Sequence, residues 1–579
     1  MSHADEFERL VKSGEPLEGL TVTDLDLSGR SLAGAWLPGA RFSKVDLRGA
    51  DLTSANLCGA ELVDCDLRGA KLLKADAREL SLLSCDLRAA DLTGADLGKA
   101  LLAHADLTGA RLDETTLTGA DLASGHAPRA SFRGATAKDT RFDSATLDGA
   151  TFDSAQIEGA TFLKTALEGA SFKQASLRET TCLSANLQKV DFTGATLDRV
   201  ILMRADLRDA KLPKKLSGVV LNEAKLTSRD FAGADLTNAD LDGRDLAGVD
   251  LSGADLSFCS LRGADLRNAD LTGARLASTV LADCDLRGAR LAGAKLSGCM
   301  LSRANLEGVD LSGQELSTVI LASANLRGAV LMGARISRCV LDGVRLDGAD
   351  LTRALVSQCS AENMVLEGAT LTGARFEGVQ LDGVDLRGVP LSGLAMVRCS
   401  LAGADLAGRT IVGCDFTDSR FSGADLTGAE LTSCILNGAQ LDDVRLSRAR
   451  IVGIVAKAAY FGGADLSEAA LPRASLRRSI FEGTNLAGAA LGGADLRETV
   501  LTRVKARKAS FAGARLSFAD LSHADVAQAD FTSADLSFSI LHATQDSGAK
   551  MEGATLLGAK RTDADRHRSE TWQQPRRTA

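Results

Sequence analysis

The residues that could bind a metal ion are few in this chain of 579 residues. It has six histidines and twelve cysteines. No histidine lies in a His-Glu-x-x-His motif, and no cysteine–histidine set has the spacing of zinc ligands. His523 and His542 could approach one another on adjacent faces, but two unconnected surface histidines are the simpler interpretation. We therefore predict no metal site and no cofactor.

Nucleophilic and acid–base chemistry is equally poorly supported. No basic residues are patterned beside the cysteines to lower their pKa and form thiolates, so apolar filling is the simpler role for them. Aspartate recurs throughout the chain as part of a repeat, so pairs of aspartates do not indicate general acid–base catalysis. The glycine-rich segments lack the lysine and serine or threonine of a phosphate-binding loop. The sequence predicts that the protein is not an enzyme.

These residues lie within a repeat of five residues, called a pentad here. The repeat is clear in LSGADLSFCSLRGADLRNADL at 251–271. Leucine returns at every fifth position, a small residue stands two places before it, and aspartate or another polar residue stands directly before it. This period matches neither an α-helix nor a flat β-strand. It favours a solenoid in which each pentad forms one side of a coil.

The repeated motif A-[DN]-L-x-x, for example ANLCG at 55–59, resembles the pentapeptide-repeat family over residues 17–560. The resemblance implies an all-β, right-handed quadrilateral β-helix of about 27 coils, with four pentads in each coil. It also implies that the central leucine or phenylalanine and the small residue point inward, and that the other three positions face solvent.

A coil of four pentads can be tested on the sequence itself, because positions four pentads apart would then stack in columns. Cysteine recurs in one inward column, and phenylalanine recurs at the centre of another. Neither column follows from the period of a single pentad. The members are Cys259, Cys299, Cys339, Cys359 and Cys399 in the first, and Phe132, Phe152, Phe172 and Phe192 in the second.

The repeat frame suggests where the chain divides. The opening residues have Phe7, Leu10 and Val11 at helical spacing and are predicted to cap the first coil, with a docking peptide as the alternative. The frame slips by one residue around Pro213, through either a bulge within one coil or a hinge between two arrays. The predicted segments are a capping helix at 1–16, a first array at 17–212, the break at 213–220, a second array at 221–560 and a polar tail at 561–579.

Bulk properties exclude several classes of protein. No run of about 18 apolar residues could span a bilayer, and the charged N-terminus lacks the apolar core of a secretory signal. Twelve cysteines without such a signal indicate reduced thiols. We expect a cytoplasmic location, or export by a route without a signal peptide, and no membrane partner.

One outward column is apolar in part of the second array, whereas the other outward columns are mostly polar. It lies directly before the central leucine on one side of the coil and is interrupted around Gln380–Gln440. Contiguous exposed apolar side chains usually mark an interface, although scattered surface hydrophobes are also normal. The apolar column, our candidate interface, contains Val280, Met300, Ile320, Val340, Ile480 and Val500.

Charge is uneven along the second array, which suits docking to a partner, although a mixed solvated surface would explain it too. The candidate acidic patch contains Asp230, Asp235, Asp240, Asp242, Asp245, Asp250 and Asp255. The candidate basic patch contains Arg473, Arg477, Arg478, Arg503, Lys505, Arg507 and Lys508.

In five coils, a long polar residue replaces the small inward residue. An unpaired buried arginine is costly, so we expect these coils to be distorted until the side chain reaches water. The five residues are Arg30, Arg229, Arg244, Gln314 and Arg409.

Two functions are compatible with this pattern. One branch of the resembled family imitates duplex DNA and binds DNA gyrase, but duplex DNA carries one charge per about 1.7 Å, and this chain has a net charge of only −9. The opening at 7–42 also resembles long arrays encoded with bacterial type VI secretion loci, which are taken to be adaptors of the secreted spike. We favour a non-enzymatic scaffold that binds protein partners and no nucleic acid, and a homodimer through the apolar column or the ends is also open.

Overall fold

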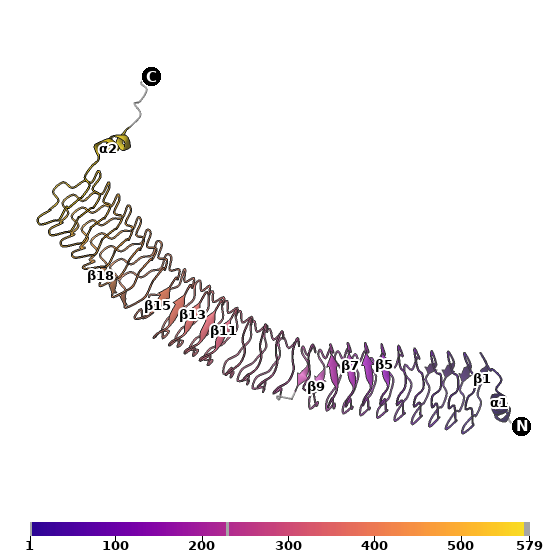
Figure 1. The fold of residues 1–579 in the computed structure, drawn as a ribbon. Helices are drawn as coiled ribbons and strands as arrows, with labels where there is room; N and C mark the ends of the chain where they lie inside the picture. The colour runs from indigo at the N-terminus through magenta and orange to yellow at the C-terminus, as the bar shows by residue number, and fades with distance from the viewer. Residues whose placement is uncertain (1–2, 227–230, 573–579) are drawn as a thin grey trace, which may run out of the picture. The chain divides into compact units, whose positions relative to one another are not determined.

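The computed structural model describes residues 3–226 and 231–572. It divides into two compact units, Met1–Leu281 and Ala282–Ala579, and in each of them short extended segments stack as successive coils (Figure 1). Among the described residues, no helix has the length and apolar character needed to cross a membrane.

The first unit begins with helix α1 (His3–Ser13), and the second ends with helix α2 (Ala564–Thr571). All named strands pair in parallel. The strands of the first unit are β1 (Thr21–Thr23), β2 (Arg41–Ser43), β3 (Glu61–Val63), β4 (Ser81–Leu83), β5 (Thr136–Lys138), β6 (Gln156–Glu158), β7 (Ser176–Arg178), β8 (Thr196–Asp198), β9 (Asp206–Leu207) and β10 (Lys225–Leu226). Those of the second are β11 (Glu315–Ser317), β12 (Arg335–Ser337), β13 (Leu355–Ser357), β14 (Arg375–Glu377), β15 (Ala395–Val397), β16 (Thr410–Val412), β17 (Glu430–Thr432) and β18 (Arg450–Val452).

Each side of the coil is one pentad, and its backbone hydrogen bonds follow a fixed pattern. The N–H of Ala254 donates to the carbonyl of Leu251 at 3.1 Å and closes the corner turn. The N–H of Leu251 donates to Asp270 in the following layer, and the N–H of Asp255 donates to Ala234 in the preceding one. Gly253 lies at the corner with a φ of 65°, a conformation that glycine adopts without a steric cost. Leu251 and Ala254 are buried between these corners.

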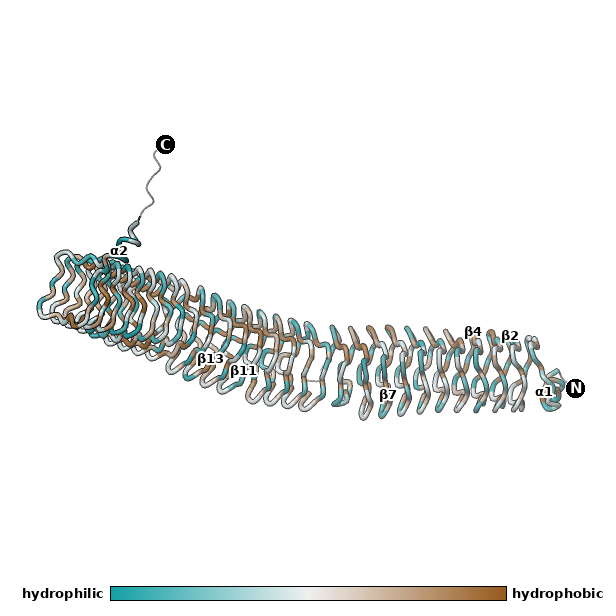
Figure 2. Tube along the Cα trace, turned by 45° about the horizontal axis from the view of Figure 1, so that its top comes forward, coloured by the Kyte–Doolittle hydropathy of each residue, from teal (hydrophilic) through white to brown (hydrophobic). Residues whose placement is uncertain are grey.

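The register between layers is four pentads, as in Thr21 opposite Arg41 and Glu315 opposite Arg335. The parallel β-solenoid predicted from the sequence is therefore confirmed. Hydrophobic positions recur at the same place in successive coils of each unit (Figure 2). The predicted phenylalanine column is confirmed as well, because Phe132 stacks on Phe152 at 4.6 Å between ring centroids and Phe152 on Phe172 at 4.8 Å.

The frame slip at Pro213 shortens one coil by one residue. Asp206 pairs with Lys225, and Ile201 pairs with Val220, and each spacing is one residue short of four pentads. The full spacing of four pentads returns with Lys215 opposite Asp235. The ladder thus continues across the break within the first unit.

Helix α1 packs against the first coils of its unit. Phe7 and Val11 are buried, and the ring of Phe7 meets Phe42 edge-on at 6.3 Å. Asp5 and Glu8 form ion pairs with Arg30 at 2.9 and 3.0 Å. The helix therefore supplies both apolar cover and counter-charges to the end of the first unit.

Candidate interaction surfaces and polar sites

The apolar column lies on successive rungs of the second unit. Met300 pairs with Ile320, and Ile320 with Val340, so these three side chains are neighbours at the spacing of a β-ladder. Met300 is 39% and Ile320 37% exposed, and Val340 is half-buried. The structure therefore places three predicted interface residues on one continuous strip, of which Met300 and Ile320 are exposed and Val340 is half-buried.

The other members of the column lie apart from this strip. Ile480 pairs with Val500 farther along the second unit, next to Tyr460. Val280 belongs to the first unit, where it pairs with Ser260. Polar residues occupy the rungs between the two apolar stretches of the second unit, and these are Ser360, Gln380, Ser400, Arg420 and Gln440.

Three exposed phenylalanines were not foreseen in the sequence. Phe258, Phe518 and Phe538 stand at coil corners with positive φ, where glycine is frequent, and are 64%, 60% and 47% exposed. The rings of Phe518 and Phe538 stack at 5.1 Å. The sequence contains a pattern that could have predicted them, because each of the three follows Leu-Ser in an otherwise regular pentad.

The aspartates of the predicted acidic patch lie on all four sides of the coil rather than on one face. The four-pentad register puts Asp240, Asp245, Asp250 and Asp255 before four successive sides. Most of these carboxylates also accept the N–H two residues ahead, as Asp235 does from Thr237 and Asp255 from Ser257. Asp242 instead accepts from Ser260 and Arg262 of the next layer. Asp230 lies outside the described residues.

The predicted basic patch is likewise divided among the four sides, and much of its charge is compensated. Arg477 and Arg478 both pair with Glu498, and Arg503 pairs with Glu482. Arg507 reaches Asp525 at 3.6 Å, and Lys505 stands on a rung beside Asn485 and Asp525. Arg473 and Lys508 occupy corners with positive φ on two different sides. These residues do not form one positive face.

Two of the long residues in the inward position, Arg244 and Gln314, are buried and bond to the backbone instead of reaching water as predicted. Arg244 is buried, and its guanidinium donates to the carbonyls of Leu221 and Ala224. Arg409 also donates to the carbonyl of Val389, but it is half-buried and reaches water in part. In a regular coil the carbonyl at this place accepts a backbone N–H of the next layer, as Ala234 does from Asp255. The inserted side chain therefore donates to a carbonyl that would otherwise accept a backbone N–H of the β-ladder.

Gln314 behaves similarly, since its side chain is buried and its Nε2 donates to the carbonyl of Leu291 at 2.6 Å. Arg30 is held by α1, and Arg229 lies outside the described residues. Burial lowers the pKa of Arg244. Cavities of about 360 and 470 Å³ lie beside Arg244 and Gln314, respectively.

The cysteines are free thiols, and nearly all are buried. In the predicted column, the N–H of Cys339 donates to Sγ of Cys359 at 3.3 Å. Burial raises the pKa of Cys182 to about 12 and that of Cys399 to about 11. Because the reactive species is the thiolate, these residues are poor nucleophiles at neutral pH and act as small core side chains.

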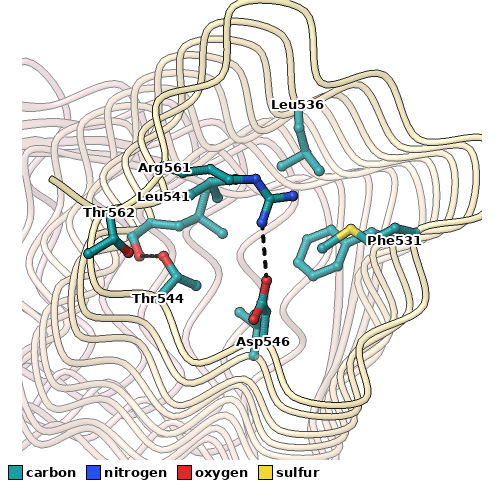
Figure 3. Close-up of a pocket in the computed structure, with 10 residues that line it drawn as sticks. Phe531, Leu536, Leu541, Thr544, Asp546, Arg561 and Thr562 are labelled. Carbon is teal, nitrogen blue, oxygen red and sulfur yellow. Dashed lines mark hydrogen bonds and ion pairs between the residues drawn. The ribbon is translucent and has the colours of Figure 1, made fainter. Parts of the chain in front are cut away.

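The second unit has a cavity of about 260 Å³ at the end of its last coil (Figure 3). Phe531, Leu536 and Leu541 supply its apolar wall. Arg561 and Asp546 face one another across it at 3.8 Å. The end of the solenoid thus exposes part of its core.

Beside this cavity, part of the segment expected to be a polar tail forms α2, and residues 573–579 of that segment lie outside the described residues. Asp563 caps the helix by accepting the N–H groups of Asp565 and Arg566. Glu570 of α2 reaches both His523 and His542, which are not the two unconnected surface histidines of our expectation. His542 is buried, and the two rings meet edge-on at 5.3 Å.

A family model described as "Pentapeptide repeats (8 copies)" matches most of the chain. No curated protein sequence matches the chain. The segments that the family model matches are 26–62, 60–97, 85–122, 129–162, 164–194, 215–253, 250–288, 274–313, 316–353, 349–388, 396–438, 459–497, 479–517 and 509–544.

Several solved structures are similar to parts of the chain. HetL of the cyanobacterium Nostoc sp. strain PCC 7120, a pentapeptide repeat protein involved in heterocyst differentiation regulation, is 26% identical over 52% of this chain and 98% of its own, with a TM-score of 0.17. The plasmid-mediated fluoroquinolone resistance protein QnrB1 is 19% identical over 33% of this chain and 93% of its own, with a TM-score of 0.17. A thylakoid-lumen protein of Arabidopsis thaliana is 33% identical over 19% of this chain and 68% of its own, with a TM-score of 0.11. At such TM-scores these likenesses do not indicate a function for this chain.

Proposed function

The chain belongs to the pentapeptide-repeat family, and on that premise we propose that it is a non-enzymatic scaffold that binds a protein partner through the apolar column. The observation that carries this proposal is the partly exposed strip of Met300, Ile320 and Val340 on adjacent rungs. Because these side chains are neighbours at ladder spacing, they form a contiguous apolar surface. Covering this surface with a partner removes apolar area from water, which favours binding.

The partner that we propose is a component of a bacterial type VI secretion spike or one of its effectors. The support for this is the resemblance of residues 7–42 to arrays encoded with such loci. A scaffold of this kind works in the cytoplasm or is exported with its cargo. A rigid ladder suits the role, since its rungs hold surface side chains at fixed intervals of about 4.8 Å.

The electrostatics do not favour the alternative of a DNA-mimicking gyrase ligand. A DNA mimic needs a dense negative face, whereas the acidic patch is spread over four sides and its aspartates accept local hydrogen bonds. Elsewhere the aspartate columns carry their own arginines: Arg68 pairs with Asp66 of its own coil at 2.5 Å and approaches Asp86 of the next at 3.6 Å. Much of this surface charge is therefore compensated within the protein.

Binding to purified spike and effector proteins tests the scaffold proposal. Replacing Met300→Asp and Ile320→Asp together should weaken binding at least tenfold, because two charges would have to be desolvated at the interface. The matched control is Leu83→Asp with Leu101→Asp, two leucines that are 51% and 50% exposed in the first unit. We expect this control to bind like the unmodified protein. Equal binding by both double variants would refute the interface, and inhibition of gyrase supercoiling by the unmodified protein would restore the alternative.

A further inference from the structure

Three potential metal ligands converge at the C-terminal end of the second unit. Oε2 of Glu570 lies 3.1 Å from Nε2 of His523 and 3.0 Å from Nε2 of His542. The three atoms all lie within 4.8 Å of one another. The histidines come from consecutive layers, where the N–H of His523 donates to the carbonyl of His542 at 2.8 Å, so the ladder itself fixes their spacing.

No buried apolar side chain holds helix α2 at this place. None of its residues is buried, and a helix of eight residues is not stable by itself in water. Apart from the ring of His567, its attachment consists of polar contacts. These are Glu570 with the two histidines, the N–H of Asp563 with Nδ1 of His542 at 3.2 Å, and Thr562 with the N–H of Ala543 at 3.2 Å. Each such hydrogen bond contributes only about 0.5–1.5 kcal/mol net of the bonds to water that it replaces. A ligand that joined Glu570 to the histidines would supply the missing stabilisation.

We propose that His523, His542 and Glu570 bind a divalent transition-metal ion, with Zn²⁺ as the best match. Two imidazoles and one carboxylate are a donor set that zinc accepts in tetrahedral sites, with ligand bonds of about 2.0–2.2 Å. Such a tetrahedron has edges of about 3.4 Å, a few tenths of an ångström longer than the two distances from Glu570 to the histidines. The fourth position is left to water or to His567, whose ring lies 6.2 Å from that of His542.

Metal binding requires a change of tautomer at His542. Its Nδ1 accepts the N–H of Asp563, so the neutral ring carries its proton on Nε2 and donates it to Glu570. When Nε2 binds the metal, that proton moves to Nδ1, and the neutral ring releases no net proton. The hydrogen bond lost is the long one of 3.2 Å.

Once Nδ1 carries this proton, it faces the N–H of Asp563 as a second donor. The chain at Asp563 therefore has to shift when the metal binds.

The bound ion would tie α2 to the last coils. The segment leading into α2 begins with Arg561 and Thr562, which line the cavity at the end of the solenoid. Ligation of Glu570 therefore holds this segment at the exposed end of the core. The inference is independent of the partner that the apolar column binds.

The test is a titration of the full-length protein with Zn²⁺ against a chelating dye. We expect one Zn²⁺ per chain. Glu570→Gln and His523→Gln, both at exposed residues, should each weaken binding at least about tenfold. His126→Gln, at an exposed histidine of the first unit, is the matched control and should bind like the unmodified protein. No binding, or unchanged binding by Glu570→Gln, would overturn the assignment.

Hydrogen exchange of α2 gives a second readout that does not depend on affinity alone. Zn²⁺ should slow amide exchange at 564–571 in the unmodified protein and in His126→Gln, but not in Glu570→Gln. A metal ion that binds without slowing exchange in α2 lies elsewhere, and this result would also overturn the site.

Discussion

Replacing Phe152 with alanine tests how much the stacked phenylalanines stabilise the first unit. Phe152 is 1% exposed and lies between Phe132 and Phe172, with Phe142 and Phe162 edge-on at 5.8 and 6.1 Å. Truncation of a buried phenylalanine costs about 3–5 kcal/mol, and each aromatic pair contributes about 0.5–1.5 kcal/mol beyond its buried area. Since Phe152 has two stacked and two edge-on partners, we expect a loss near the upper end, about 4–5 kcal/mol.

The loss should be local, because coils of a solenoid contact only their neighbours. Native-state hydrogen exchange is the suitable assay, since it reports the opening free energy of separate segments. Amides between residues 130 and 195 should exchange faster in Phe152→Ala, while those of the second unit should not change. Phe518→Ala is the matched control, because the same truncation at a side chain that is 60% exposed should cost less than about 1 kcal/mol. Equal losses in the two variants, or faster exchange throughout the chain, would refute this account of the core.

Two further predictions concern buried polar groups. Arg244→Ala restores the small residue of a regular coil and removes a guanidinium whose Nε has no partner among the described residues. The free energy of unfolding should therefore rise by about 1–3 kcal/mol. A lower thermal midpoint by circular dichroism would contradict this. Burial raises the pKa of Cys182 to about 12, well above pH 8, so its thiolate should be nearly absent in the folded protein. A chromogenic disulfide reagent at pH 8 should therefore titrate only the half-buried Cys58 in the folded chain and all twelve thiols in urea; rapid modification of Cys182 in the folded chain would contradict this.

The columns could be predicted from the sequence because they depend only on the period. Once four pentads make a layer, Phe132 must lie over Phe152 and Met300 beside Ile320. The same reasoning placed Cys339 and Cys359 next to each other inside the coil. A backbone that repeats strictly leaves little for tertiary context to change.

The departures from the repeat were harder to predict. Arg244 was expected to reach water, but it bonds to carbonyls of the preceding layer, and sequence spacing alone does not reveal that alternative acceptor. Helix α2 lacks apolar periodicity, and its main signal is the capping residue Asp563. Its approach to His523 and His542 depends on where the chain turns after the last coil. The candidate metal site therefore became visible only in three dimensions.

The four-pentad register also determines which changes of length a unit tolerates. Losing one pentad would turn every later side chain of that unit by a quarter turn, so an apolar rung would lie over a charged one. Losing four pentads would remove a whole layer and leave all four sides in phase. The one-residue contraction before Val220 keeps the phase too, because Asp206 still pairs with Lys225. Such a chain can grow by duplicating whole layers while each surface keeps its direction.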